Sequence, residues 1–177
     1  RYATPEQKAL YVPAALRGEQ IWSQLFSEPS TGSDLAAVRT RAVREGDDWV
    51  ISGQKVWTTF AQYSDFGVIV ARTDPDAPKH RGLTYFFVDL KAPGVSVRPI
   101  RQLHGSEEFN EVFFDEVRIP DAWRLGEIGA GFRLAVETLM IERYTAAADE
   151  TGFGPPLEAL TAIAETARLN GGSALDD

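Results

Sequence analysis

The sequence predicts an α+β fold, in which an antiparallel β-barrel or β-sandwich of about seven strands is flanked by helical segments. About seven short segments between residues 21 and 119 carry apolar or alternating side chains, and turn-forming residues separate them at the spacing typical of all-β domains. No helical pattern of any length interrupts these segments, which argues against a parallel α/β sheet. Helical patterns occur only before and after this region.

The change of pattern along the chain predicts three domains. We expect residues 1–19 to end an N-terminal helical domain, residues 20–122 to form the central β domain, and residues 123–177 to begin a truncated C-terminal helical domain. The chain starts at Arg1 rather than at methionine, and its last residues, 171–177, are polar. We therefore expect the chain to be a fragment of a longer protein.

A helix is predicted at the start of the chain. Thr4 can cap a helix that begins at Pro5, and Gln7 completes a capping box. Pro13 lacks the backbone N–H that a helix interior needs, so we expect the helix to be short or broken there. Gly18 is expected to end it.

The predicted strands follow from apolar runs and from alternation of apolar and polar residues. They are residues 21–27, 40–44, 49–55, 66–72, 83–90, 95–100 and 111–119. Residues 45–48 (EGDD) carry a hairpin signal between the second strand and the third. Residues 34–37 are expected to form one helical turn capped by Ser33 or Asp34.

The pattern becomes helical again after Pro120. Residues 126–131 form a glycine-rich connector, and residues 132–148 favour a helix because Ala, Leu, Met and Glu dominate them. Residues 152–156 (GFGPP) are expected to break that helix, and residues 157–169 to form another.

Composition narrows the classes of function. The chain has 177 residues, 44% of them hydrophobic, which is enough for a packed core. It has no cysteine and only two histidines, so we expect neither a disulfide framework nor a metal site. The net charge of −8 argues against a nucleic-acid partner. We find no apolar run of membrane-spanning length and no signal peptide, and we expect a soluble, cytoplasmic protein.

Two segments combine hydroxyl groups, glycine and an aromatic ring. Residues 25–34 (LFSEPSTGSD) are small and hydroxylated, and residues 53–59 (GQKVWTT) end in an aromatic ring and two hydroxyls. Together they offer the hydrogen-bond donors and the flat apolar surface that a planar heteroaromatic cofactor needs. Taken singly, the first segment also fits an ordinary surface turn, and Trp57 fits a core aromatic.

Four motifs in this order resemble the middle of an acyl-CoA dehydrogenase. Residues 27–36 (SEPSTGSDLA) resemble the flavin and CoA loop of that family, and residues 53–59 resemble its second flavin segment. Residues 109–120 (FNEVFFDEVRIP) resemble the strand that ends its β domain. Residues 126–132 (GEIGAGF), followed by Glu142-Arg143, resemble the entry to its C-terminal helices.

The resemblance implies a flavin oxidoreductase. Members of the family use FAD to oxidise an acyl-CoA thioester to the 2,3-enoyl-CoA, in fatty-acid metabolism and lipid degradation. They pass electrons to an acceptor of the electron-transfer flavoprotein type. They are usually dimers or tetramers in which FAD touches two subunits, so we expect a homo- or hetero-oligomer. We expect the isolated chain to be inactive and to retain FAD weakly or not at all, because other walls of the site are absent.

The resemblance also assigns the flavin contacts. Phe26 matches a position that bonds the flavin ring through its backbone, and Ser27 matches one that does so through its hydroxyl. Trp57 matches an aromatic that packs against the ring system, and Thr59 matches a hydroxyl near the N5 edge. Donors placed there stabilise the charge that the ring gains when hydride arrives.

The remaining loop residues face the substrate or shape the loop. Ser33 matches a residue that faces the CoA portion, and Gly32 lets the backbone approach closely. The chain departs from the family at Ser30-Thr31, where a Gly-Ala pair is common, and at Phe60, where asparagine is frequent.

Glu142 is the candidate catalytic base, and Arg143 matches a position that lines the substrate site. On a helix Glu142 shares a mostly apolar face with Leu139, Thr138, Ala135 and Ala146. A carboxylate on such a face would lose hydration and gain a raised pKa, which suits removal of an α-proton. Two alternatives stay open: the family has a second position for its base, beyond the end of this chain, and Glu142 also fits an ordinary surface residue.

Three other functions remain possible from the sequence. The first is a non-catalytic partner subunit of a heteromeric acyl-CoA dehydrogenase. The second is a flavin oxidase or monooxygenase on the same scaffold, which would produce peroxide in air without a CoA thioester. The third is a free-standing β-sandwich that binds a ligand without flavin.

Overall fold

A computed structural model describes residues 2–148, 157–169 and 172–173. The chain divides into two compact units, Arg1–Met140 and Ile141–Asp177. The break predicted at residues 152–156 lies outside the described residues. None of the described helices is both long enough and apolar enough to span a lipid bilayer.

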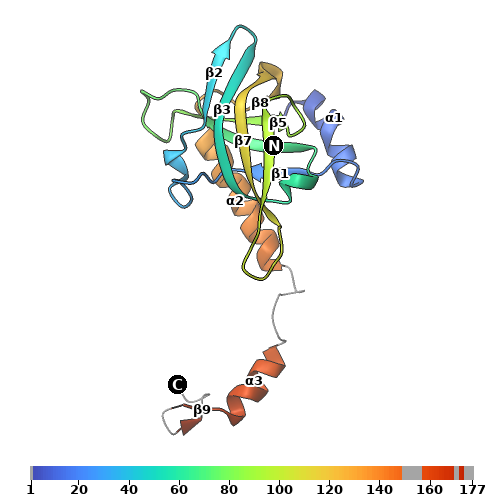
Figure 1. Cartoon of the computed structure of the whole chain (residues 1–177), viewed down its shortest axis with the longest axis vertical. Helices are drawn as coiled ribbons and strands as arrows, with labels where there is room; N and C mark the ends of the chain where they lie inside the picture. The colour runs from blue at the N-terminus through green and yellow to red at the C-terminus, as the bar shows by residue number, and fades with distance from the viewer. Residues whose placement is uncertain (1, 149–156, 170–171, 174–177) are drawn as a thin grey trace. The chain divides into compact units, whose positions relative to one another are not determined.

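The first unit is built on an eight-stranded sheet (Figure 1). All the predicted strands are present, and β8 is an addition that the sequence analysis missed. The strands are β1 (Trp22–Leu25), β2 (Arg41–Glu45), β3 (Asp48–Thr59), β4 (Phe66–Arg72), β5 (Leu83–Asp89), β6 (Val95–Ile100), β7 (Phe109–Pro120) and β8 (Arg124–Leu125). Their order is β6-β7-β3-β2-β4-β5-β8, with β1 also paired to β4.

The β2–β3 hairpin forms where it was predicted. Glu45 pairs with Asp48, and Gly46 adopts the positive φ of 65° that a two-residue hairpin turn requires. Figure 1 shows this hairpin extending from the body of the sheet.

The α+β class is confirmed, but the sheet is mixed and open, whereas the sequence analysis expected an antiparallel barrel or sandwich. β1 runs parallel to β4 from Trp22↔Phe66 to Leu25↔Ile69, and β2 meets β4 in parallel at the single pair Arg41↔Arg72. Parallel neighbours need a long crossover, and the β2–β3 hairpin with its flanking loops supplies one without a helix. The sheet does not close.

Two apolar clusters cover opposite faces of β4 and β5. The inner cluster includes Ile69 and Phe86, together with residues of β3 and β7. The outer cluster includes Val70 and Tyr85, together with residues from two helices. Because both faces of these two strands are covered, both strands are continuous apolar runs rather than alternating ones.

Helix α1 (Pro5–Leu16) starts with the predicted capping box. Gln7 N–H donates to Thr4 Oγ1 over 3.2 Å, and Thr4 N–H donates to Gln7 Oε1 over 2.8 Å. Gly18 ends the helix as predicted, with a φ of 69° and a bond from Glu19 N–H to the Ala14 carbonyl.

Pro13 does not break α1, contrary to prediction. The helix continues to Leu16 because proline removes only the hydrogen bond to the Ala9 carbonyl, and Ala9 is exposed, so that water can reach it. Tyr11, 7% exposed, holds α1 to the sheet through edge-to-face contacts with Trp22 and Phe87.

The other helical predictions are largely met. Helix α2 (Gly131–Ala148) occupies the predicted range, and its first turns place Leu134 and Ala135 in the outer cluster. The turn at 34–37 is a 3-10 helix, η1 (Leu35–Ala37), but no side chain caps it, because Asp34 instead pairs with Lys79. Further 3-10 turns are η2 (Ala61–Tyr63) and η3 (Asp121–Trp123).

The second unit contains the last helix of the described chain. α3 (Leu157–Thr166) ends three residues before the predicted limit at residue 169. There the chain forms β9 (Arg168–Leu169), which pairs antiparallel with β10 (Gly172–Ser173). Pairing with a downstream strand therefore overrides the helical tendency of the last residues.

Candidate functional site

The two segments singled out in the sequence lie side by side. The Ser23 hydroxyl donates to the Thr59 carbonyl over 2.9 Å, and Val56 N–H donates to the Ser27 carbonyl over 2.9 Å. Residue 23 contacts residue 59, and residue 27 contacts residue 56. The chain at the end of β1 therefore runs antiparallel to the end of β3. We call residues 26–33 together with residues 57–59 the loop face.

The loop after β1 is a tight turn with a buried root. Glu28 and Thr31 exchange backbone hydrogen bonds of 2.7 and 3.0 Å around Pro29-Ser30. The Phe26 ring is 5% exposed and packs edge-on against Tyr85, with ring centroids 5.7 Å apart. The Phe26 ring is therefore part of the core. The flavin contact that the family resemblance implies for its backbone stays a prediction.

Trp57 is an exposed aromatic, not a core one. It occupies a β-bulge. Lys55 pairs with Val112 and Thr58 pairs with Asn110, so two residues of β3 lie opposite a single residue of β7. Its φ is 60° and the residue is 58% exposed, with only an edge contact to Phe109. A left-handed conformation in a bulky residue costs on the order of 1–3 kcal/mol and tends to occur at functional sites.

Three hydroxyl groups of the loop face are available to a ligand, those of Ser27, Ser33 and Thr59, whereas Thr31 and Thr58 are buried. Ser27 is half-buried, and Ser33 and Thr59 are exposed. Among the residues that the structure describes, their side-chain oxygens make no hydrogen bond. A Cβ on Gly32 would meet nothing within 4 Å, so the chain itself leaves the space above that backbone open. This arrangement fits a planar polar ligand that lies on the loop.

A buried ion pair beneath the loop was missed in the sequence analysis. Lys55 is fully buried, and its Nζ lies 2.9 Å from Glu28 Oε1 and 3.1 Å from the Phe26 carbonyl oxygen. The signal that could have found the pair is a lysine at the end of a predicted strand, next to the apolar Val56, together with one glutamate in a loop of hydroxyl residues.

The pair has perturbed ionisation. Burial lowers the pKa of Lys55 to about 8, against the opposing effect of the Glu28 charge. Burial alone would raise the pKa of Glu28, but the Lys55 charge and hydrogen bonds from Lys55, Thr40 and Arg39 outweigh it and hold that pKa below its usual value.

Glu142 and Arg143 lie on α2, as predicted, and both are exposed. They belong to the second unit, whereas the loop face belongs to the first. The burial of Glu142 expected from its apolar helix face is not provided by the residues that the structure describes. Its role as base stays a prediction.

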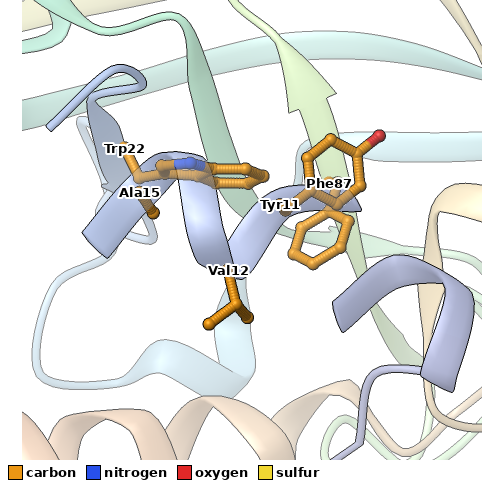
Figure 2. A pocket seen from close by; sticks show the side chains of 5 residues that line it. All are labelled: Tyr11, Val12, Ala15, Trp22 and Phe87. Carbon is orange, nitrogen blue, oxygen red and sulfur yellow. The ribbon is translucent and has the colours of Figure 1, made fainter. Parts of the chain in front are cut away.

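Two hollows of the first unit lie along α1, and none of the residues that line them belongs to the loop face. Figure 2 shows a pocket of about 200 Å³ lined by Tyr11, Val12, Ala15, Trp22 and Phe87. A hollow of about 370 Å³, on the side of α1 toward Ala122 and Trp123, is lined by Thr4, Glu6, Gln7 and Leu10 as well. Within residues 2–148, 157–169 and 172–173, we find no cluster of three or more metal-ligating side chains.

The chain belongs to the acyl-CoA dehydrogenase family. The model of the acyl-CoA dehydrogenase middle domain matches residues 23–117. The acyl-CoA dehydrogenase FadE34 of Mycobacterium tuberculosis is 52% identical over 162 residues, which cover 92% of this chain and 23% of that protein.

Solved structures of the family share the fold. The Tcur3481-Tcur3483 steroid ACAD is 33% identical, with a TM-score of 0.73 over 88% of this chain and 44% of that one. The ChsE4-ChsE5 complex from Mycobacterium tuberculosis is 35% identical, with a TM-score of 0.74 over 99% of this chain and 45% of that one. The chain thus spans 23% to 45% of the length of these relatives.

Proposed function

We propose that the protein uses FAD to oxidise an acyl-CoA thioester to the 2,3-enoyl-CoA. The observation that carries the proposal is the loop face itself. In a domain of the acyl-CoA dehydrogenase family, it combines hydroxyls without protein partners, an open glycine and a strained, exposed tryptophan.

In this proposal, different residues of the loop face hold different parts of the cofactor and of the substrate. The Ser27 hydroxyl and the Phe26 backbone would hold the polar edge of the flavin, the Trp57 ring would pack against the ring system, and the Thr59 hydroxyl would serve as a donor near N5. Ser33 and the open backbone at Gly32 receive the CoA portion of the substrate. Bound FAD supplies the hydride acceptor. Donors fixed in advance around it stabilise charge as it develops.

Glu142 is the base that we propose for the α-proton, with Arg143 beside the substrate. The competing position for the base lies outside this chain. The domain assignment belongs to the same proposal: residues 1–19, 20–122 and 123–177 contribute to a helical, a β and a second helical domain. An electron-transfer flavoprotein-type acceptor then reoxidises a homo- or hetero-oligomeric enzyme, whose place would be the cytoplasm.

The proposal is tested on the protein produced from its complete reading frame. We expect a yellow protein whose visible flavin band bleaches anaerobically on addition of an acyl-CoA. The panel should contain straight-chain, branched and steroid side-chain thioesters, because one structural relative is described as a steroid ACAD. Protein that cannot be reconstituted with FAD contradicts the proposal. Rapid peroxide formation in air without a CoA thioester supports the oxidase alternative instead.

The Glu142→Gln variant tests the base. If Glu142 removes the α-proton, we expect turnover to fall by about 10²- to 10⁴-fold while flavin content stays unchanged. Glu158→Gln, on an exposed position of α3, is the matched control and should leave turnover unaltered. Unchanged turnover in Glu142→Gln places the base elsewhere in the protein or in a partner chain, as the partner-subunit hypothesis requires.

A further inference from the structure

We infer that the buried Glu28–Lys55 pair is a positioning pair, which holds the loop after β1 against β3 and thereby sets the geometry of the loop face. The inference rests on the proposed function for its link to FAD. Its core statement concerns the chain alone and can be tested without cofactor.

Glu28 closes the loop on itself. One carboxylate oxygen accepts from Arg39 N–H over 2.7 Å, and the other accepts from Thr40 N–H over 2.8 Å. Residue 28 stands at the root of the loop, and residues 39–40 lead directly into β2. One side chain therefore joins the two ends of a loop that carries Ser27, Gly32 and Ser33.

Lys55 joins that loop to the second wall. It lies on β3, two residues before Trp57, and its Nζ donates both to Glu28 Oε1 and to the Phe26 carbonyl. The next residue, Val56, donates its N–H to the Ser27 carbonyl. The carbonyls of Phe26 and Ser27 are thus both held by β3, which anchors the backbone that carries the Ser27 side chain.

Stability alone does not account for a pair buried this deeply. The Lys55 side chain is fully buried and that of Glu28 is 4% exposed. The cost of removing two charges from water largely offsets their attraction, so apolar side chains of similar size would be about as stabilising. Apolar side chains would, however, leave the N–H groups of residues 39 and 40 and the carbonyl of residue 26 without partners. What the pair contributes uniquely is the position of these backbone groups.

The test compares Lys55→Met with the double variant Glu28→Gln/Lys55→Met, in which no charge is left unpaired. The matched control is Glu45→Gln/Arg118→Met, which removes an exposed ion pair between β2 and β7. Amide hydrogen exchange, read by mass spectrometry on the apo protein, reports loop position. Thermal unfolding, FAD titration and the visible flavin spectrum complete the measurements.

We expect faster exchange confined to residues 26–40 and 56–59 in the double variant, with the rest of the sheet unchanged. We also expect the FAD dissociation constant to rise about tenfold or more, with a shifted flavin spectrum. The control should match the wild type in every measurement. A general role in stability predicts instead a lower unfolding temperature with faster exchange throughout the first unit, and that outcome overturns the inference.

If the double variant does not fold, the single variant Glu28→Gln provides the test. The glutamine side chain keeps the shape of glutamate but has one acceptor oxygen, so it can accept from only one of the N–H groups of residues 39 and 40. We therefore expect faster amide exchange around these residues. Wild-type exchange in Glu28→Gln overturns the inference. If the wild-type protein produced from its complete reading frame binds no FAD, the proposed function fails, and the exchange measurements still decide whether the pair positions the loop.

Discussion

Gly32 and Gly53 belong to the two segments singled out in the sequence, residues 25–34 and 53–59, and the structure shows different surroundings for them. Gly53 has a φ of 153°, and an added Cβ would lie 2.6 Å from Thr40 Oγ1 and 2.8 Å from Thr40 Cα. Gly53 therefore has no room for a side chain inside the protein itself, whereas Gly32 has ample room.

This contrast predicts separable effects. Gly53→Ala should lower the free energy of unfolding by about 2 kcal/mol, because the backbone of Thr40 must move. Gly32→Ala should change it by less than about 0.5 kcal/mol and instead weaken FAD binding. Urea unfolding and flavin titration of both variants check the prediction. Equal stability losses in the two variants would contradict it.

Asp121 forms an acid-sensitive contact outside the loop face. Its carboxylate accepts from Arg124 at 2.9 and 3.0 Å and from Trp49 Nε1 at 2.7 Å. The hydrogen bonds from Arg124 come first among the effects that lower the pKa of Asp121 from 3.8 to about 2, with the Trp49 bond and the Arg124 charge adding to them against a smaller effect of burial.

Because the folded pKa lies below the unfolded one, the ionised Asp121 stabilises the fold above pH 3.8, and this contribution is lost as the pH falls towards about 2. Asp121→Asn should therefore unfold at a lower temperature near neutral pH and lose less stability on acidification than the wild type. Thermal melts across that pH range test this. Asp115→Asn, exposed on β7, should follow the wild-type curve.

At the scale of the element, α1 is held by a side chain with two tasks. Gln7 accepts from Thr4 in the capping box, and its Nε2 donates to the carbonyls of Ala122 and Arg124 over 2.7 and 3.3 Å. Gln7 is 8% exposed, so those contacts are largely shielded from water.

The two tasks of Gln7 predict a graded series. Thr4→Ala removes one cap and should cost about 1 kcal/mol. Gln7→Ala also removes the donor to two carbonyls and should cost about 2–3 kcal/mol. Gln7→Glu keeps the cap acceptor but loses the donor, so it separates the two contributions. Urea unfolding gives the ranking, and a Thr4→Ala cost equal to that of Gln7→Ala would contradict it.

The sequence analysis succeeded where a feature depends on near neighbours in the chain. The capping box, the hairpin at Gly46 and the apolar strands β4 and β5 each follow from local pattern. The parallel β1–β4 pairing, the short strand β8 and the packing of Tyr11 against the sheet depend on residues far away in sequence. The bulge at Trp57 depends on the register with β7, and the full burial of Lys55 depends on Glu28 in a distant loop, so the sequence motif alone did not predict either of them.

At the scale of the whole molecule, the first unit contains both of its apolar clusters. Every buried member of the two clusters lies between Tyr11 and Ala135. We therefore predict that a chain ending at residue 148, which keeps α2 whole, unfolds cooperatively at the temperature of residues 1–177. Removal of residues 1–20 should lower that temperature, because it takes Tyr11 and Gln7 from the buried set. Calorimetry of residues 1–177, 1–148 and 21–177 gives the three unfolding temperatures. A clearly lower unfolding temperature for residues 1–148 would contradict the prediction.

The parallel pairing of β1 with β4 has a consequence for synthesis on the ribosome. Trp22 and Phe66 are partners 44 residues apart, so β1 leaves the ribosome well before the strand that it must join. At about 5–20 residues per second, its apolar residues wait roughly 2–9 s for their partner. Until β4 emerges, the segment that leads into the loop face is an unpaired apolar strand, and this interval is when the nascent chain is most exposed to aggregation and most in need of a chaperone.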